Sequence, residues 1–278
     1  MHDSAEETDS LSLVERYFGG ECWMNTRMRL LVAGICWMAM GLVTIPAMAQ
    51  SKVNIDTLLE KLDKLYRSNS SKGVMSMTVV TPHYRRTLKM EIITRGMDDT
   101  LIRIVSPRKE KGVSTLKRGN EMWNYLPKIK KVIRIPASMM GGSWMGSDLT
   151  NDDLVRGSSY ESDYVTRQVK ADASEICLEH IPKEDAVITW SKVVSCFYED
   201  NQLPKRMEFY DEKGRKVRLI AYSEIKMLGG RLAPTRMTLT PLSGDKLGNE
   251  TVVSFDEMEF DVEVNSTTFS EANLRRGR

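Results

Sequence analysis

The sequence predicts a mainly β (α+β) domain built on a single, strongly curved antiparallel sheet, an incomplete β-barrel of about eleven strands. Short β-rich runs with a period of two recur between positions 73 and 260, with turn residues between them. One amphipathic helix precedes these runs, and a glycine-hinged segment rich in methionine and tryptophan interrupts them. We therefore expect an N-terminal helix and a helical lid that covers an apolar cavity.

Residues 1–49 have the features of a leader and are expected to lie outside the fold. A basic stretch at 24–29 is followed by an apolar run at 30–45 and by Ala47-Met48-Ala49 before Gln50, the pattern of a cleaved signal peptide. Residues 1–23 are acidic, so we place the true start at Met24. A retained membrane anchor is the alternative, although the apolar run is short for one. The expected product, residues 50–278, is one domain secreted into the periplasm.

The charge of this product argues against a nucleic-acid-binding protein. Removing the leader's three Arg and six Asp/Glu from totals of 40 and 38 leaves 37 basic and 32 acidic residues, a net charge of +5. These charges are interspersed along the chain, whereas nucleic-acid-binding proteins gather theirs into patches.

The first predicted element is a helix over residues 54–66. Ile55, Leu58, Leu59, Leu62, Leu65 and Tyr66 recur at three- and four-residue spacing, and Asn54 or Asp56 can cap the start. Its single apolar stripe requires an apolar surface to cover.

Two groups of strands are predicted to form that surface. The first group covers residues 73–81, 87–95, 100–105, 112–117, 121–125 and 128–135, and the second covers 175–181, 187–198, 205–210, 217–223, 231–240 and 251–260. Close spacing with plain turns indicates antiparallel neighbours joined by hairpins. A sheet this wide would expose a large apolar face if it stayed flat, so we expect it to curl.

Between the two groups lies the most informative segment of the chain. Met139, Met140, Trp144 and Met145 lie among Gly141, Gly142 and Gly146, before a predicted helix at 148–155. Methionine adapts to irregular apolar partners, so this composition favours a movable cover. The alternative is an irregular loop that plugs the end of the core.

The two cysteines of the expected product, Cys177 and Cys196, lie on consecutive predicted strands. In an oxidising compartment they can form a cross-strand disulfide. Two independently buried thiols are the alternative.

No catalytic residue, metal site or cofactor is predicted. His83 and His180 stand alone in the sequence, without the spacing of a metal site. The acidic cluster at 148–153 lacks the pattern of a calcium loop, and we interpret Asp148 and Asn151 as caps of the following helix. Catalysis by carboxylates that meet only in the folded chain stays open.

Several motifs together resemble the LolA-like outer-membrane lipoprotein-sorting proteins, and more narrowly a periplasmic branch linked to RND-type exporters. The motifs are Ser106-Pro107, GNEMWNYLP at 119–127, SWMGSDLTNDDL at 143–154 and GGRLAPTRM at 229–237. The resemblance implies a half-barrel with a lid over a cavity for acyl chains, and a carrier in place of an enzyme. It also implies an arginine on an early strand that holds the lid, for which Arg85, Arg86, Arg95 and Arg103 are candidates.

From the resemblance we expect a monomeric periplasmic carrier that shields the acyl chains of a lipoprotein or lipid on the way to the outer membrane. An inner-membrane RND-type or ABC-type exporter is the expected protein partner. The residues expected at the lid and cavity mouth are Met139, Met140, Trp144, Met145, Trp123 and Tyr125. A periplasmic lipid sensor or exporter accessory is one alternative, and an enzyme acting on lipid or glycan is another.

Overall fold

The computed structural model describes residues 54–156, 160–186 and 188–276, all within one unit, Val53–Arg278. The predicted signal peptide lies outside these residues. No helix in the described ranges has the length and apolarity needed to cross a membrane.

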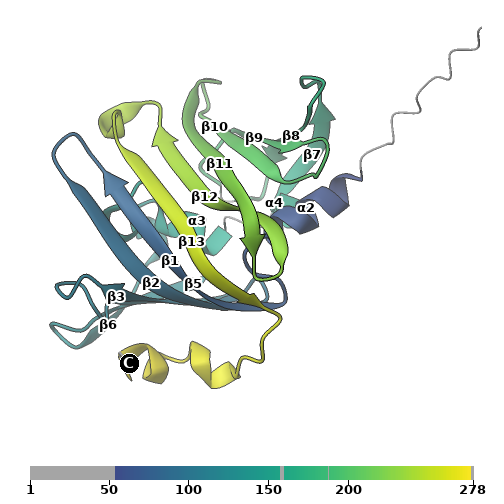
Figure 1. Ribbon diagram of the computed structural model, residues 1–278. Coiled ribbons are helices and arrows are strands. Elements are labelled where there is room, and N and C mark those ends of the chain that lie inside the picture. Colours follow the sequence, from purple (N-terminus) through teal and green to yellow (C-terminus); the bar gives the residue numbers. More distant parts are fainter. Residues whose placement is uncertain (1–53, 157–159, 187, 277–278) are drawn as a thin grey trace, which may run out of the picture. The chain divides into compact units, whose positions relative to one another are not determined.

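All described strands form one antiparallel sheet (Figure 1). They are β1 (Ser70–Val80), β2 (Arg85–Arg95), β3 (Asp99–Ser106), β4 (Ser114–Arg118), β5 (Glu121–Leu126), β6 (Lys131–Arg134), β7 (Tyr164–Val169), β8 (Glu175–Pro182), β9 (Lys192–Tyr198), β10 (Pro204–Tyr210), β11 (Lys216–Leu228), β12 (Arg231–Pro241) and β13 (Glu250–Phe260). Their order across the sheet is β6-β5-β4-β3-β2-β1-β13-β12-β11-β10-β9-β8-β7. The prediction of one curved antiparallel sheet is therefore confirmed.

The sheet has thirteen described strands, where about eleven were predicted and twelve strand-like runs were recognised in the sequence. The strand absent from the predicted set is β7, which pairs only with β8. Its sequence, YVTRQV, is mostly polar, and its residues are exposed or half-buried. An edge strand of this kind lacks the clear apolar alternation by which strands are recognised.

Short helices flank the strands. They are α2 (Ile55–Asp63), α3 (Asn151–Arg156), α4 (Tyr160–Asp163) and α5 (Glu271–Arg276), with single 3₁₀ turns at Ala137–Met139, Trp144–Gly146, Gly244–Lys246 and Ser266–Phe269. As predicted, Asn54 caps α2, since its side chain accepts a hydrogen bond from the Thr57 amide.

The predicted caps of α3 were wrong. Thr150 caps this helix, because the Thr150 hydroxyl accepts from the Asp153 amide while the Asp153 carboxylate accepts from the Thr150 amide, a reciprocal capping box. Asp148 instead accepts hydrogen bonds from Thr251 and Asn249, and the Asn151 side chain donates to the Met139 carbonyl.

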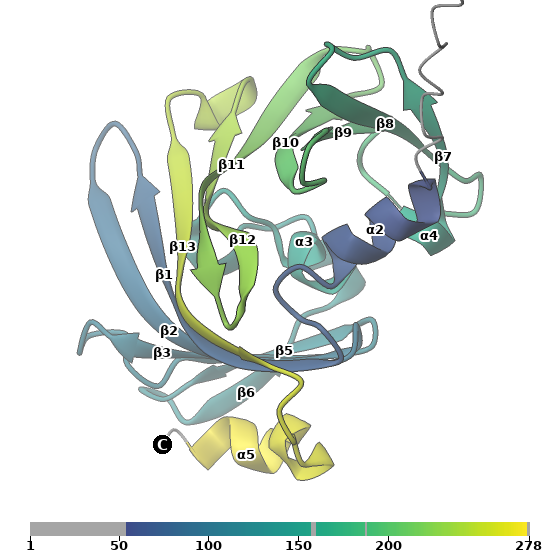
Figure 2. The ribbon, with the colours of Figure 1, turned by 45° about the vertical axis from the view of Figure 1, so that its right-hand side comes forward.

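Topology explains why residues 135–163 cover the sheet. The strands that precede and follow this segment, β6 and β7, are the two opposite edges of the sheet. The connecting chain must therefore cross from one edge to the other, and it does so on the concave side, where α3, α4 and α2 lie (Figure 2). We call residues 135–163 the crossing segment; residues 157–159 of it lie outside the described ranges.

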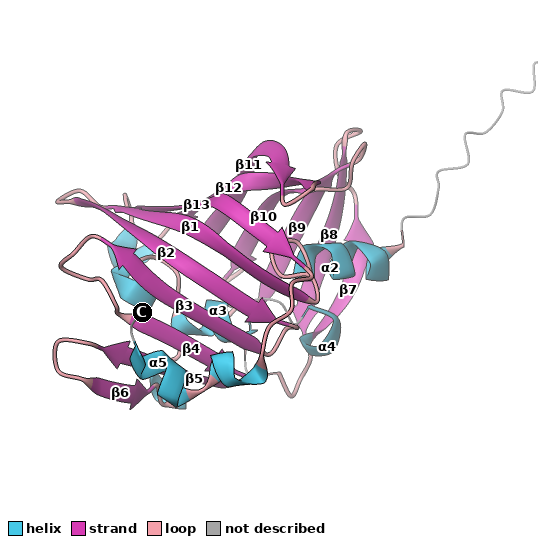
Figure 3. Ribbon diagram, turned by 60° about the horizontal axis from the view of Figure 1, so that its bottom comes forward, coloured by secondary structure: helices cyan, strands magenta, loops and turns pink. Residues whose placement is uncertain are grey.

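The two faces of the sheet bury separate clusters. On the concave face, strand residues such as Met77, Met90 and Ile102 pack with Trp144 and Val155 of the crossing segment. A neighbouring concave cluster joins α2 to strands β8–β12 through Leu58 and Leu59. On the convex face, Leu101, Leu116 and Tyr125 pack against Phe269 and Leu274 of the C-terminal segment, which Figure 3 shows in front of the strands around β4 and β5.

Candidate ligand cavity

A cavity of about 240 Å³ lies between the concave face, α2 and the crossing segment. A second hollow of about 170 Å³ shares six of its lining residues, including Tyr222 and Met237. The walls of the larger cavity are mainly apolar: Leu62, Leu65, Tyr66, Met75, Met77, Met90, Ile92, Ile102, Trp144, Leu149, Leu154, Tyr160, Met207, Tyr222, Met237, Val253 and Phe255 line it, with Asp63, Arg67, Thr100 and Asp153.

Strand alternation places these side chains. In β2, the even-numbered residues Leu88, Met90 and Ile92 are buried while Lys89 and Glu91 are exposed, as the period of a strand requires. Methionine supplies five of the lining residues, Met75, Met77, Met90, Met207 and Met237. Flexible, polarizable side chains in such numbers give a wall that can reshape itself around an irregular apolar ligand.

Trp144 closes the cavity from the crossing segment. Only 1% of its surface is exposed, and its Nε1 donates a hydrogen bond to the Thr115 hydroxyl at 3.0 Å. That hydroxyl in turn donates to the Asn124 side chain at 2.7 Å. Leu149 and Leu154 of the same segment also line the cavity.

Two arginines of the sheet hold the crossing segment. Arg86 donates to the Met145 carbonyl and pairs with Glu110 at 3.2 Å. Arg218, which is buried, donates to both carboxylate oxygens of Asp153 in α3, at 3.0 and 2.9 Å. Both hydrogen bonds come from the same nitrogen, Nη1, and charge-assisted bonds of this kind are stronger than bonds between neutral groups.

Among the four arginines considered from the sequence, Arg86 therefore contacts the crossing segment. Arg95 pairs with Asp99 and lies over the Phe269 ring. Arg103 donates to the Asn273 carbonyl, also in the C-terminal segment, and Arg85 is exposed.

The cavity has a polar end beside α2. Arg67 donates to the carbonyls of Gly96, Met97 and Asp99 and to the Thr100 hydroxyl. The pKa of the Asp63 carboxyl is raised to about 7, mainly by burial and also by nearby Glu161, whereas Arg67 opposes the shift. One Asp63 oxygen is buried without a hydrogen-bond partner among the described residues.

The structure separates the six residues expected at the lid and cavity mouth. Trp144 lines the cavity, and Met140 is buried in the concave cluster beside it. Met145 packs against the same cluster, and Met139 is 58% exposed.

Trp123 and Tyr125 lie on the other side of the sheet from the cavity. They belong to the convex cluster with Phe269 and Leu274. They are out of phase with Met122, which faces the concave cluster, so the pleat of β5 turns them away. This placement differs from the cavity mouth expected from the sequence.

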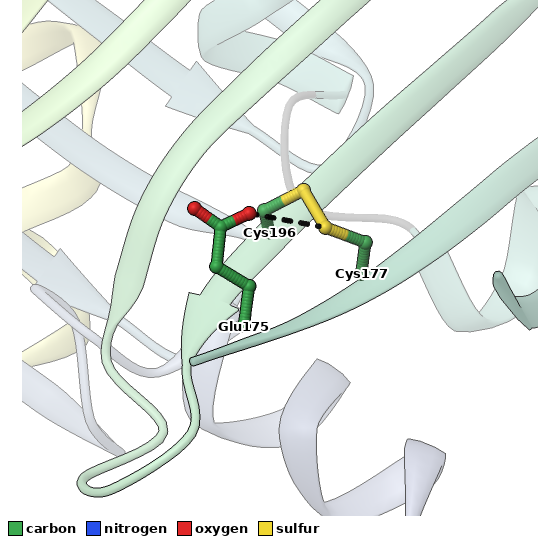
Figure 4. A group of neighbouring side chains, drawn as sticks. All are labelled: Glu175, Cys177 and Cys196. Carbon is green, nitrogen blue, oxygen red and sulfur yellow. Dashed lines mark hydrogen bonds between the residues drawn. A yellow bond between two sulfur atoms is a disulfide. The ribbon is translucent and has the colours of Figure 1, made fainter. Parts of the chain in front are cut away.

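Cys177 and Cys196 face each other across β8 and β9 and form a disulfide (Figure 4). Glu175 lies beside them, with a carboxylate oxygen 3.7 Å from the Cys177 sulfur. Within the described ranges, these three residues are the one group with the proximity of metal ligands. A disulfide has no thiolate to offer a metal, and Glu175 is already paired with Lys205 and Arg206.

His180 forms a buried network that resembles a catalytic arrangement. Its Nε2 lies 2.7 Å from the Ser195 hydroxyl, and its Nδ1 lies 2.9 Å from the Thr166 hydroxyl. Burial lowers the pKa of His180 to about 4, so the imidazole is neutral at pH 7. Both His180 and Ser195 are buried and neither lines the two hollows, which favours a structural role.

A family model and several solved structures match this chain. A family model described as an uncharacterized protein matches residues 96–276, well over half of the chain. A search of curated proteins found no match.

Several solved structures share the fold. A DUF1329 family protein from Desulfovibrio piger is 25% identical, with a TM-score of 0.68, over 78% of this chain and 96% of that one. A LolA superfamily protein from Nitrosomonas europaea is 21% identical (TM-score 0.65), over 80% of this chain and 99% of that one. A candidate outer membrane lipoprotein-sorting protein domain from Vibrio parahaemolyticus is 22% identical (TM-score 0.66), over 78% of this chain and 97% of that one.

Proposed function

We propose that this chain, which belongs to the family whose model matches residues 96–276, is a periplasmic carrier of acyl chains, because it shares its fold with a LolA superfamily protein and a lipoprotein-sorting protein domain. The cavity shields the chains of a lipid or lipoprotein from water during transfer toward the outer membrane. The crossing segment acts as the lid.

The observation that carries this proposal is the apolar, methionine-rich cavity closed by a separate segment of chain. Its wall comes from the sheet and its cover from residues such as Trp144, Leu149 and Leu154. At about 240 Å³, the closed cavity is smaller than the roughly 300–1,000 Å³ typical of ligand pockets. A long acyl chain therefore has to displace part of the cover.

That displacement makes binding reversible. Burying ten methylene groups contributes about 8 kcal/mol at roughly 0.8 kcal/mol each. Withdrawing Trp144, Leu149 and Leu154 from the cavity costs at most about 4.5–9 kcal/mol in return, since a fully buried apolar side chain is worth about 1.5–3 kcal/mol. The cover thus fills part of the cavity when no ligand is bound. Its return to the cavity favours release of the ligand.

The test is to identify lipid that co-purifies with the protein and to ask whether the cavity holds it. Met237 lines both hollows and is half-buried, so Met237→Trp should fill the space without adding charge. Lipid extracted from the exported protein and measured by mass spectrometry should fall about tenfold or more in Met237→Trp. The control Met227→Trp changes an exposed methionine of β11 and should retain the lipid.

The outcomes separate the competing functions. Bound lipid that is unchanged in folded Met237→Trp, or no lipid in the wild-type protein, would contradict the carrier. Lipid that binds but never passes to acceptor vesicles would favour a lipid sensor. Lipid recovered in a chemically altered form would favour an enzyme.

A further inference from the structure

One end of the sheet carries a concentration of exposed basic residues. In an antiparallel meander, alternate turns lie at the same end, so the turns after β1, β3 and β5 (residues 81–84, 107–113 and 127–130) all lie at one end of the sheet. They contain five exposed cations, Arg108, Lys109, Lys111, Lys128 and Lys130, and one acid, Glu110. The two turns at the opposite end of these strands (residues 96–98 and 119–120) contain no cation and one acid, Asp98.

The basic charges are available to a partner. Glu110 is paired with Arg86, and in the described part of the chain none of the five cations has an ion-pair partner. The turns lie close together in two pairs: a Cβ placed on Gly112 would lie 3.6 Å from the Pro127 side chain, and one placed on Gly248 would lie 3.8 Å from that of Pro82. The second contact adds the turn after β12, residues 242–249. We call these four turns the basic rim.

Large apolar side chains protrude from the turns of the basic rim. Tyr84 and Ile129 are half-exposed or more, and Leu247 is 64% exposed. Lysine and arginine together with protruding aliphatic and tyrosine side chains are typical of surfaces that lie at the interface of a bilayer. A site for a small anion would instead need donors that converge on one point, whereas these cations are spread over separate turns.

The basic rim also touches the crossing segment. Lys246 donates to the Ser143 hydroxyl at 2.7 Å, and Arg86, at the start of β2, holds the Met145 carbonyl. Asp148 accepts from Thr251 at 2.7 Å. The contacts that fasten residues 143–148 therefore lie at this end of the sheet.

We propose that the basic rim docks on a bilayer that contains anionic phospholipid. The cations bind the headgroup layer, and Tyr84, Ile129 and Leu247 enter the boundary between headgroups and acyl chains. Docking brings the fastened part of the crossing segment to the membrane surface. This surface is separate from the cavity, so the inference stands whether or not the cavity holds acyl chains.

The experiment measures sedimentation of the exported protein with vesicles of phosphatidylcholine alone or mixed with phosphatidylglycerol. We expect binding only with phosphatidylglycerol, and weaker binding at high salt. The variant Lys109→Ser/Lys128→Ser/Lys130→Ser should bind on the order of a hundredfold more weakly, since each basic residue near an anionic bilayer contributes roughly fivefold. The control Lys72→Ser/Lys170→Ser/Lys213→Ser removes the same charge from exposed positions elsewhere and should lose little.

A second pair of variants tests the apolar contribution at constant charge. Ile129→Ser/Leu247→Ser changes side chains that are 55% and 64% exposed, and the control Met227→Ser/Leu232→Ser changes side chains of β11 and β12 that are 63% and 55% exposed. Only the first pair should weaken vesicle binding. Folding of every variant is checked by circular dichroism.

Three results would overturn the proposal. The first is an equal loss of vesicle binding in the rim and control lysine variants. The second is wild-type binding that does not depend on phosphatidylglycerol. The third is binding to soluble polyglutamate that is as tight as binding to vesicles. The last result would assign the rim to an acidic protein partner. Soluble fatty acid binding should be the same in the rim variants and the wild type, which separates this test from that of the carrier function.

Discussion

At the scale of single residues, parity along a strand decides which side chains face the cavity. Arg86 is in phase with Leu88, Met90 and Ile92 of β2, whereas Arg85 and Arg95 are out of phase. Arg103 is out of phase with Ile102 and Ile104, which pack on the concave side. The alternation in the sequence therefore singles out Arg86, provided that one residue of the strand is already known to face the cavity.

Gly146 is the glycine of the crossing segment whose backbone requires glycine. Its φ is +67°, in the left-handed region, and a Cβ there would lie 3.3 Å from the Arg86 guanidinium. Gly146→Ala should destabilise the closed segment by about 1 kcal/mol and speed amide exchange of Ser147 and Asp148 roughly fivefold. Gly141→Ala, where a Cβ meets nothing within 4 Å, is the control. Equal exchange in both variants would argue against this account of the hinge.

Asp63 should make stability depend on pH in a direction unusual for a carboxyl group. Its pKa in the folded protein is about 7, above the ordinary value of 3.8, so between these values the folded state binds more protons than the unfolded state. The free energy of unfolding should fall as pH rises through this window. Asp63→Asn should therefore be more stable than wild type at pH 8, with a gap that shrinks toward pH 4.

The measurement is the urea midpoint of both proteins across this pH range. His180 has a lowered pKa, so its contribution has the opposite sign: it lowers the free energy of unfolding as pH falls from about 6.5 to 4. That contribution is common to both proteins and cancels in the difference. A gap that is constant with pH would show that Asp63 is not the group responsible.

At the scale of elements, the crossing segment is fastened by a few polar contacts over an apolar cavity. The Arg86–Met145 and Arg218–Asp153 contacts join it to β2 and β11. A small number of such contacts can be broken together without unfolding the sheet, and segments that move in function are drawn from the less stable parts of a structure.

Removing the Arg86 contact should loosen the segment selectively. Arg86→Ala loses a hydrogen bond from a charged group, which we expect to cost about 1.4 kcal/mol, the low end for such bonds because the side chain is 33% exposed. Backbone amides that donate to carbonyls of the same segment, such as Trp144 to Leu149 and Asn151 to Gly142, should exchange about tenfold faster. The sheet should exchange as before.

The neighbouring arginine provides the matched control. Arg85→Ala removes an exposed guanidinium one residue away and should leave exchange in the segment unchanged. If both variants loosen the segment alike, general loss of charge at this end of β2 is the cause and the contact with Met145 carries no special role.

At the scale of the whole molecule, local patterns predicted the elements and left their assembly open. The period of two predicted twelve of the strands, and the spacing of Ile55 to Tyr66 predicted α2, because these signals lie within a few neighbouring residues. The pairing of β6 and β7 with opposite edges is a long-range property that no short window contains. For the same reason the sequence could not tell that Trp123 and Tyr125 face the C-terminal segment, nor that Arg218 reaches Asp153.

The central claim is that an acyl chain enters the cavity beneath the crossing segment. The most direct measurement uses a fatty acid that carries a photoactivatable diazirine, with the labelled residues located by mass spectrometry. We predict labels on the cavity wall and its cover, at Met77, Met90, Ile102 or Trp144, and competition by unlabelled fatty acid. Labels confined to the convex cluster around Leu116 and Leu274, or scattered without competition, would contradict the account.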